Sequence, residues 1–585
     1  MKFKLLYFIA FIILLFTPKA HSQDILQIND LTGKKGGTLV LALLSDPRTF
    51  NPLVASTDQA SASITTMMFD GLTQINVKTQ EVQPAIAKSW EVSKDGKEWI
   101  FHLRKGIKWS DGMPITADDV IFTFEAIYRP DVETPSKDIL QINQQPLKAA
   151  KIDQYSIKIT LPEIYAPFLR QMEKSTVPIL PKHKWEKTLK EGNFTTAMGL
   201  NSEPTDIVVS GPYLLEKYIP GQRVILKANP NYYKYDKNKI QLPYFDKIII
   251  NIITDINSIY LKLLSGELDL WESLRPEDYS MLKDNAQKTK KAQLNVGKLG
   301  ISPAPEMLWF NLNNDLNPKT KQHFIEKKKL NWFNNPLFRQ AIAHAIDRET
   351  IIRNIYYGAA KPTYGLETDS NIVWNNATLT PYEYNVKKSK EFLKKAGFTL
   401  KPAGRDKVAL FDSKGNEVKF TLVTNTKHAA RASAVNLIAS DLKKIGMSVT
   451  VQLLEFQNLV VKLSETFDYD AVVLSLTRPD FDPSAAMNVV LSSSGMHLWH
   501  PNQEKPATAW EAKIDELMNL QIKTYDQKLR KKYYDEVQQI LHEQIPIIYL
   551  YSPLAISAYK TTLLNMKCTV IEPRCTWNIE ELSFK

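Results

Sequence analysis

The sequence predicts a large α/β or α+β protein, in which short strands alternate with helices in mixed sheets. The chain has 585 residues, a length that suits two to four domains with a large buried core. Hydrophobic residues make up 44% and charged residues 23%, ordinary globular values that exclude disordered, collagen-like and disulfide-scaffold proteins. Apolar runs of strand length are separated by runs of helix length. No repeat or low-complexity linker divides the chain, so we expect its domains to be interleaved.

The N-terminus has the pattern of a secretory signal peptide. Two lysines precede an unbroken apolar run, residues 5–16, and small residues, Ala20 and Ser22, stand at the −3 and −1 positions before Gln23. The run is too short to cross a bilayer as a helix, which needs about 20 residues. No cysteine follows it, so no lipid anchor is expected. We expect residues 1–22 to be removed and the mature chain to be soluble.

The first half of the mature chain contains three predicted strands and two predicted helix starts. Residues 38–42 form an apolar run after a glycine pair, and residues 99–104 read as a strand before a Lys-Gly turn. Residues 248–253 are apolar except for one asparagine, which predicts a strand buried on both faces. Thr116 and Asp255 precede apolar-periodic runs and are predicted to cap helices.

The second half continues the alternation. Pro336 is predicted to open a helix whose apolar residues continue to Ile346. Residues 418–424 and 448–454 are predicted strands, and a helix through residues 435–442 lies between them. Strands separated by helices of this length favour α/β or α+β lobes.

The formal net charge of +11 is spread along the chain rather than gathered in one region. Lysines occur singly or in short groups, whereas nucleic-acid-binding proteins cluster basic residues on one face and use arginine at base edges. We interpret the charge as a solvated surface and expect no nucleic-acid partner.

Only two cysteines occur, Cys568 and Cys575, which excludes a multi-thiolate metal cluster. They are seven residues apart, and in an oxidising compartment they can close one short loop through a disulfide. Two free thiols are the alternative. A metal-binding pair is less favoured, because no histidine lies near either cysteine.

Motifs of catalysis are absent from the sequence. It has no phosphate-binding loop, dinucleotide glycine fingerprint or nucleophile elbow. His497 and His500 are three residues apart, but a following proline makes a helix there unfavourable, so we interpret them as loop histidines rather than metal ligands. Asp118 and Asp119 stand at a helix start, where the dipole stabilises them. We expect no catalytic residues, no metal site and no cofactor.

Many short motifs in a fixed order resemble the family 5 extracellular solute-binding proteins, the oligopeptide- and dipeptide-binding receptors of ATP-binding-cassette (ABC) importers. The most specific block contains PAIAKSWEVS at 84–93, WIFHLR at 99–104, KWSDG at 108–112 and TADDV at 116–120. The other matches are TFNP at 49–52, MFDGL at 68–72, SGPY at 210–213, NPNYY at 229–233, SGELD at 265–269, FNLN at 310–313, PLFRQA at 336–341 and AIDR at 345–348.

The resemblance implies a bilobed periplasmic-binding-protein fold with an inserted domain and a hinge. The first lobe would combine residues 23–69, 195–297 and 546–585. The inserted domain would span 70–194 and the second lobe 298–545. A ligand would lie between lobes that close about the hinge.

The resemblance also implies ligand-binding residues in three places. The loop after the first strand contributes Thr57, Asp58 and Gln59, and the segment after the SGELD motif contributes Trp271 and Glu272.

A third group comes from the segment that follows Tyr469-Asp470, with Ser475, Thr477, Arg478 and Asp480. In this segment the tryptophan usual in the family falls on Leu476, and the aspartate that pairs with a peptide's α-ammonium falls on Pro479. Asp480 could take that role from one residue further on. Arg478 instead suits a carboxylate or phosphate.

Two classes of function follow. The first is a periplasmic receptor that captures oligopeptides or peptide-like solutes and delivers them to the permease subunits of an ABC importer in the inner membrane. Within this class, a non-peptide solute such as an opine, a sugar phosphate or a nickel complex is the alternative. The second class is a secreted hydrolase with an unrecognised site. A monomer is expected.

We predict cleavage of the exported chain before Gln23, because the short apolar run and the small residues before it match the substrate of signal peptidase. N-terminal sequencing of the product from the periplasmic fraction should begin at Gln23. An intact Met1 on membrane-bound protein would contradict the prediction.

Overall fold

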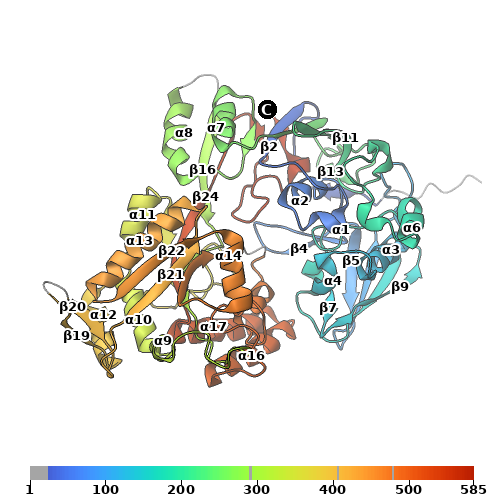
Figure 1. Ribbon diagram of the computed structural model, residues 1–585. Coiled ribbons are helices and arrows are strands. Elements are labelled where there is room, and N and C mark those ends of the chain that lie inside the picture. The colour runs from blue at the N-terminus through green and yellow to red at the C-terminus, as the bar shows by residue number, and fades with distance from the viewer. Residues whose placement is uncertain (1–23, 289–292, 405–407, 477–479) are drawn as a thin grey trace, which may run out of the picture.

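The computed structural model describes residues 24–288, 293–404, 408–476 and 480–585. Two large hydrophobic cores define two lobes (Figure 1). The core of the first lobe is built from residues between 31 and 270 together with residues 563–582. The core of the second lobe is built from residues between 307 and 551. The interleaving expected from the sequence is therefore present, because the chain returns to the first lobe at its C-terminal end.

A four-stranded sheet lies in the first lobe, in the order β11 (Tyr213–Ile219), β12 (Arg223–Ala228), β14 (Lys247–Ile252) and β2 (Thr38–Leu43). Strands β14 and β2 are the runs expected at 248–253 and 38–42. The expectation that β14 is buried on both faces is wrong. Ile248 and Ile250 are buried, but alternate residues are only half-buried, because one face of the strand packs in the core and the other is partly open. Helix α7 (Ile256–Ser265) begins after Asp255, whose carboxylate accepts two backbone N–H groups.

Segment 70–194 forms its own antiparallel sheet, in the order β5 (Ala87–Val92), β6 (Glu98–Leu103), β10 (Ser156–Thr160) and β9 (Lys148–Asp153). Its helices include α3 (Ala117–Tyr128), which starts at the expected capping box of Thr116 and Asp119, and the short α5 (Phe168–Gln171). Its buried side chains are continuous with the core of the first lobe.

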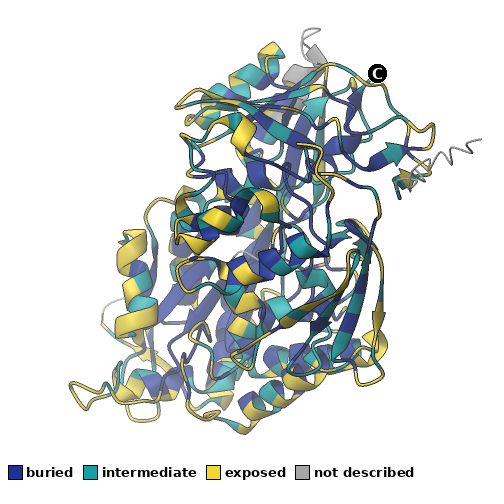
Figure 2. Cartoon of the chain, turned by 90° about the vertical axis from the view of Figure 1, so that its right-hand side faces the viewer, coloured by how far each residue is buried: buried dark blue, intermediate teal, exposed yellow. Residues whose placement is uncertain are grey.

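The second lobe contains the strands β17 (Glu306–Phe310), β23 (Ala471–Ser475), β21 (Lys419–Asn425) and β22 (Ser448–Leu454), in this order. Strand β21 runs parallel to both β22 and β23. The helices α10 (Pro336–Ala345), α13 (Ala429–Lys444), α16 (Ala509–Ile522) and α17 (Gln527–Gln544) contribute buried residues to the same core. Figure 2 shows buried residues along the strands and exposed residues along the outer helices.

One strand belongs to both lobes. Strand β24 (Ile547–Lys560) pairs with β17 and β18 (Ala360–Pro362) through its first half. Through its second half it pairs with β16 (Leu294–Ile301) and β15 (Leu270–Trp271). The lobes are thus joined by β16 and β24, and the expected lobe boundaries at 297/298 and 545/546 lie inside β16 and just before β24. In the portion of the chain that is described, no helix is long and apolar enough to cross a membrane.

A buried ion pair ties the C-terminal segment to the first lobe. The Nζ of Lys234, in β13 (Lys234–Asp236), lies 2.7 Å from Oε1 of Glu580 and 2.8 Å from Oε1 of Gln74. The two charged side chains are only 5% and 7% exposed. Because a buried charge without a partner is costly, each of these residues depends on the other.

Replacing Lys234 by Met should lower the free energy of unfolding by about 3–5 kcal/mol, because Glu580 would be left as an unpaired buried charge. Urea unfolding followed by circular dichroism measures the change. The control is Lys187→Met, which removes an exposed lysine of α6 (Lys182–Lys190) and should change little. Equal stability of the two variants would contradict the prediction.

The histidines singled out in the sequence have structural partners. Glu511 of α16 accepts hydrogen bonds from Trp499 Nε1 at 2.9 Å and Thr508 Oγ1 at 2.7 Å, and His497 Nε2 lies 3.3 Å from it. The Nε2 of His500 lies 3.0 Å from Oδ2 of Asp315. Burial opposes ionisation of Glu511, but these hydrogen bonds outweigh it and lower its pKa to about 2.

The stabilisation from Glu511 should depend on pH. Its folded pKa of about 2 is below the ordinary value of 4.5, so its contribution is complete above pH 4.5 and is lost as the pH falls toward 2. The difference in unfolding free energy between the parent and Glu511→Gln should therefore shrink by roughly 3 kcal/mol between neutral pH and pH of about 2. Denaturant titrations across this range test it. Glu516→Gln, an exposed change on the same helix, should show a difference that stays nearly constant.

Candidate functional site

The candidate site in the second lobe is built on one edge of its sheet. Strands β21 and β23 run parallel and end there at Asn425 and Ser475, and the antiparallel β17 begins there at Glu306. Ser475 pairs with Glu306 across the two strands, and its hydroxyl donates to the carbonyl of Ala304 at 3.2 Å. Ligands of open α/β sheets bind outside the carboxyl ends of parallel strands. The predicted site residue Ser475 therefore lies at the edge where a ligand is expected.

A buried ion pair fixes this edge. The guanidinium of Arg431, on α13, makes two bonds to Glu306, of 2.6 Å from Nε and 2.8 Å from Nη2. Its Nη1 donates to Oδ1 of Asn425 at 2.7 Å. The forked geometry is the strong form of such a pair. Neither residue could be predicted from the sequence, because nothing in the apolar strand after Glu306 marks its carboxylate as a partner of a residue 125 positions away.

The loop that leaves this edge contains Asp480. Thr477 and Arg478, also predicted to bind ligand, lie outside the described residues. The carboxylate of Asp480 is bound by Arg170 of α5, with 2.9 Å between Nε and Oδ2 and a second bond between Nη2 and Oδ1. Arg170 also donates from Nη1 to the carbonyl of Gln80 at 2.7 Å. The pair is 12% and 23% exposed, and it joins segment 70–194 to the second lobe.

The residues around Asp480 form a compact set of charges. Asp482 is held by Arg530 of α17 through two bonds, of 3.0 Å and 2.9 Å. Burial opposes its ionisation, but the charge and hydrogen bonds of Arg530 lower the pKa of Asp482. Near Arg170, burial raises the pKa of Glu173 to about 7, and the negative charge of Asp480 acts in the same direction. Arg170 and Arg530 thus neutralise Asp480 and Asp482, and the carboxyl group of Glu173, with a pKa of about 7, lies near them.

Thr57 and Asp58 lie in the loop between two short helices, α1 (Pro52–Ala55) and α2 (Gln59–Thr65), and Gln59 is the first residue of α2. Asp58 caps α2, because its carboxylate accepts the N–H of Ser61 at 2.9 Å and its hydroxyl at 2.7 Å. Thr57 and Gln59 are exposed. Within the described part of the chain, no hydrogen bond joins these three residues to Asp480 or to Glu272.

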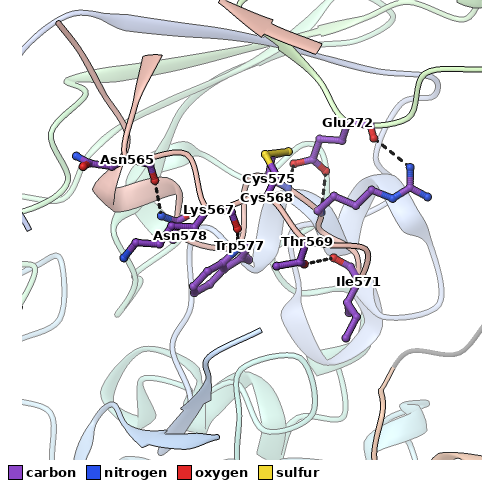
Figure 3. Close-up of a disulfide and its surroundings, with 10 residues drawn as sticks. Glu272, Asn565, Lys567, Cys568, Thr569, Ile571, Cys575, Trp577 and Asn578 are labelled. Carbon is purple, nitrogen blue, oxygen red and sulfur yellow. Dashed lines mark hydrogen bonds between the residues drawn. A yellow bond between two sulfur atoms is a disulfide. The ribbon is translucent and has the colours of Figure 1, made fainter. Parts of the chain in front are cut away.

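Trp271 and Glu272 lie at the end of β15. Trp271 is buried in a small core beside β24, and its Nε1 donates to the carbonyl of Ser273 at 2.9 Å. The carboxylate of Glu272 accepts the backbone N–H groups of Cys575 at 2.9 Å and Arg574 at 3.2 Å, and Figure 3 shows the Glu272 side chain pointing toward Cys575. Burial raises the pKa of Glu272. The structure therefore places this predicted ligand-binding residue against the C-terminal loop.

Cys568 and Cys575 are joined by a disulfide (Figure 3). The loop that it closes carries Val570 and Ile571, which form a small apolar cluster with Phe481 and Ala555. The structure thus brings Glu272, the cysteines and Phe481 into one region, although these residues are distant in sequence. Among the described residues, no three His, Cys, Asp or Glu side chains are grouped to hold a metal ion.

Comparison with known proteins identifies the family. The family model of bacterial extracellular solute-binding proteins, family 5 Middle, matches residues 81–497. The oligopeptide-binding protein AppA of Bacillus subtilis is 28% identical over 531 residues, which are 89% of this chain and 87% of that protein. The dipeptide-binding protein of Escherichia coli is 23% identical over 568 residues, which are 94% of this chain and 95% of that protein.

The solved structure of B. subtilis AppA in complex with a nonapeptide has the same fold. Its TM-score is 0.67 at 25% sequence identity, and the match covers 95% of this chain and all of that one. These relatives are binding proteins rather than enzymes. The family and the bilobed fold predicted from the sequence are confirmed. This chain belongs to the family 5 bacterial extracellular solute-binding proteins.

Proposed function

We propose that this protein is a periplasmic receptor that captures oligopeptides or peptide-like solutes between its lobes and delivers them to an ABC importer. The observation that carries the proposal is the junction of the two lobes by β16 and β24 alone among the described strands. A pair of strands that runs from one lobe to the other is a suitable hinge for closure around a ligand. Relatives named for binding oligopeptides and dipeptides match along nearly the whole chain.

The proposed ligand contacts come from both lobes. The second lobe offers Ser475, Thr477, Arg478 and Asp480, which follow the carboxyl end of β23. The first lobe offers Thr57, Asp58, Gln59, Trp271 and Glu272. Residues 23–69, 195–297 and 546–585 would act as the first lobe, with 70–194 as an inserted domain and 298–545 as the second lobe. The two separate cores support the division into two lobes, with segment 70–194 sharing the core of the first lobe.

Export completes the proposal. Removal of residues 1–22 would release a mature chain that carries no lipid anchor and acts as a periplasmic monomer. Its partners would be the ligand and the permease subunits of an importer in the inner membrane. The apolar run 5–16 and the absence of a cysteine directly after it support this arrangement.

The pairing of Asp480 with Arg170 has a consequence for recognition. A ligand ammonium that used Asp480 would have to displace or share a guanidinium that already makes two bonds to it. A ligand carboxylate could instead approach Arg170 from the same side. A charged ligand group at the proposed site would therefore bind by replacing one member of the Arg170–Asp480 ion pair, because Asp480 is not a free carboxylate.

Replacing Asp480 by Asn should weaken binding of a retained peptide at least tenfold, about 1.4 kcal/mol. The reason is that a charge desolvated in the complex typically contributes roughly 2–5 kcal/mol. Native mass spectrometry of the purified protein, offered synthetic peptides of graded length, identifies a retained peptide, and calorimetry then compares the variants. Asp468→Asn, an exposed carboxylate of the same lobe, is the matched control.

Four results bear on the proposal. Peptides retained and recovered intact support a receptor, whereas cleaved peptides would indicate the hydrolase. Failure of the parent to retain any peptide would refute peptide capture. Equal affinity of Asp480→Asn and the parent would show that this loop does not read charge, and recognition would then have to lie near Thr57 and Trp271.

A further inference from the structure

We propose that the disulfide loop, Cys568–Cys575, is a brace that holds the Asp480 segment in place between the lobes. The Asp480 segment is defined here as residues 480–482. The loop belongs to the C-terminal part of the chain, whereas the segment belongs to the second lobe. The role of the brace in ligand binding rests on the proposed function, but the brace itself can be tested without a ligand.

The base of the loop is anchored to the first lobe. Glu272 accepts the N–H groups of Arg574 and Cys575, and Nη1 of Arg574 donates back to the Glu272 carbonyl at 3.0 Å. Glu272 directly follows Trp271, which pairs with Ala558 of the shared strand β24. These bonds fix the C-terminal side of the loop to the end of β15, which pairs with the shared strand β24.

The tip of the loop packs on the Asp480 segment. Val570 and Ile571 are 9% and 8% exposed, and they form one apolar cluster with Phe481 and Ala555. Val570 also packs closely against β16, because a Cβ added to Gly300 of that strand would lie 3.0 Å from Cγ1 of Val570. The loop therefore spans from the first lobe, across β16 and β24, to the second lobe.

Phe481 is the residue through which the brace acts on Asp480. The neighbouring Asp482 is fixed by Arg530, and the Phe481 carbonyl accepts from Asn371 at 3.0 Å. The N–H of Phe481 donates to Oδ1 of Asp480 at 2.6 Å, so the backbone at Phe481 orients the same carboxylate that Arg170 binds. Displacing the Phe481 ring would disturb this hydrogen bond directly.

The disulfide makes the brace effective. Without it, residues 568–575 would gain the conformational freedom of an open segment, and their tip would leave the cluster more often. With it, the packing surface of Val570 and Ile571 is held opposite Phe481. The loop thus acts as a positioning element for Asp480 and makes no covalent or catalytic contribution.

Two variants test the brace, and both are compared with the parent by hydrogen exchange at the amides of Phe481 and Asp482. Ile571→Ala removes the packing but keeps the disulfide, and Cys568→Ser with Cys575→Ser removes the disulfide but keeps the apolar tip. Both should exchange at least about tenfold faster at these amides, because loss of buried packing lowers the cost of local opening. Ile571→Val should restore most of the protection. Ile152→Ala, an exposed change in β9, is the control and should leave these amides unchanged.

Unchanged exchange at Phe481 and Asp482 in Ile571→Ala would overturn the brace, whatever the behaviour of the double serine variant. If the parent binds a peptide, Ile571→Ala should lower the affinity for that peptide about fivefold or more, while the midpoint of thermal unfolding changes little. Faster exchange with unchanged affinity would overturn the role in positioning Asp480 for the ligand. If the parent binds no peptide, the proposed function fails, and the exchange result alone decides the brace.

Discussion

The pairing of one strand with both lobes is the constraint on which the rest of the structure depends. Strand β24 gives its first half to the sheet of the second lobe and its second half to β15 and β16. If a strand that pairs along its whole length shifts its register by one residue, every side chain on it moves to the opposite face of the sheet. Backbone hydrogen bonds at this junction therefore link the lobes, and contacts of segment 70–194 with the second lobe, such as Arg170 with Asp480 and Ala166 with Ile522, add a second link away from it.

Charges between and within the lobes are neutralised by the protein itself. Arg170 pairs with Asp480, Arg530 with Asp482, and Arg431 with Glu306, and each pair is largely or fully buried. Removing a charge from water is costly unless a partner and further hydrogen bonds compensate, so these pairs hold one another in defined positions. A solute that enters this region meets groups that are already oriented, and its own charges must compete with existing partners.

The candidate site was only partly accessible from the sequence. Family motifs predicted Ser475 and Asp480 as site residues, and Ser475 ends β23, but the partner of Asp480 could not be inferred. Arg170 is 310 residues away in the chain and sits in a one-turn helix whose sequence has no binding signature. Asp58 is predicted to lie beside a ligand, and the structure adds a role in capping α2 that the sequence did not indicate. Such roles depend on which side chains meet, and spacing along one chain segment does not contain that information.

The sequence by itself determined the local elements and the family. Strands β2, β6, β14, β21 and β22 and helices α3, α7, α10 and α13 occur where apolar periodicity and capping residues predicted them, because these signals act within a few residues. Only the tertiary structure decided that β14 is buried on alternate residues and that β24 serves both lobes. It also decided that the disulfide loop shares an apolar cluster with Phe481 and that Arg170 binds Asp480. Each of these depends on the packing of segments far apart in the chain, where burial and pairing energies, rather than local propensity, fix the outcome.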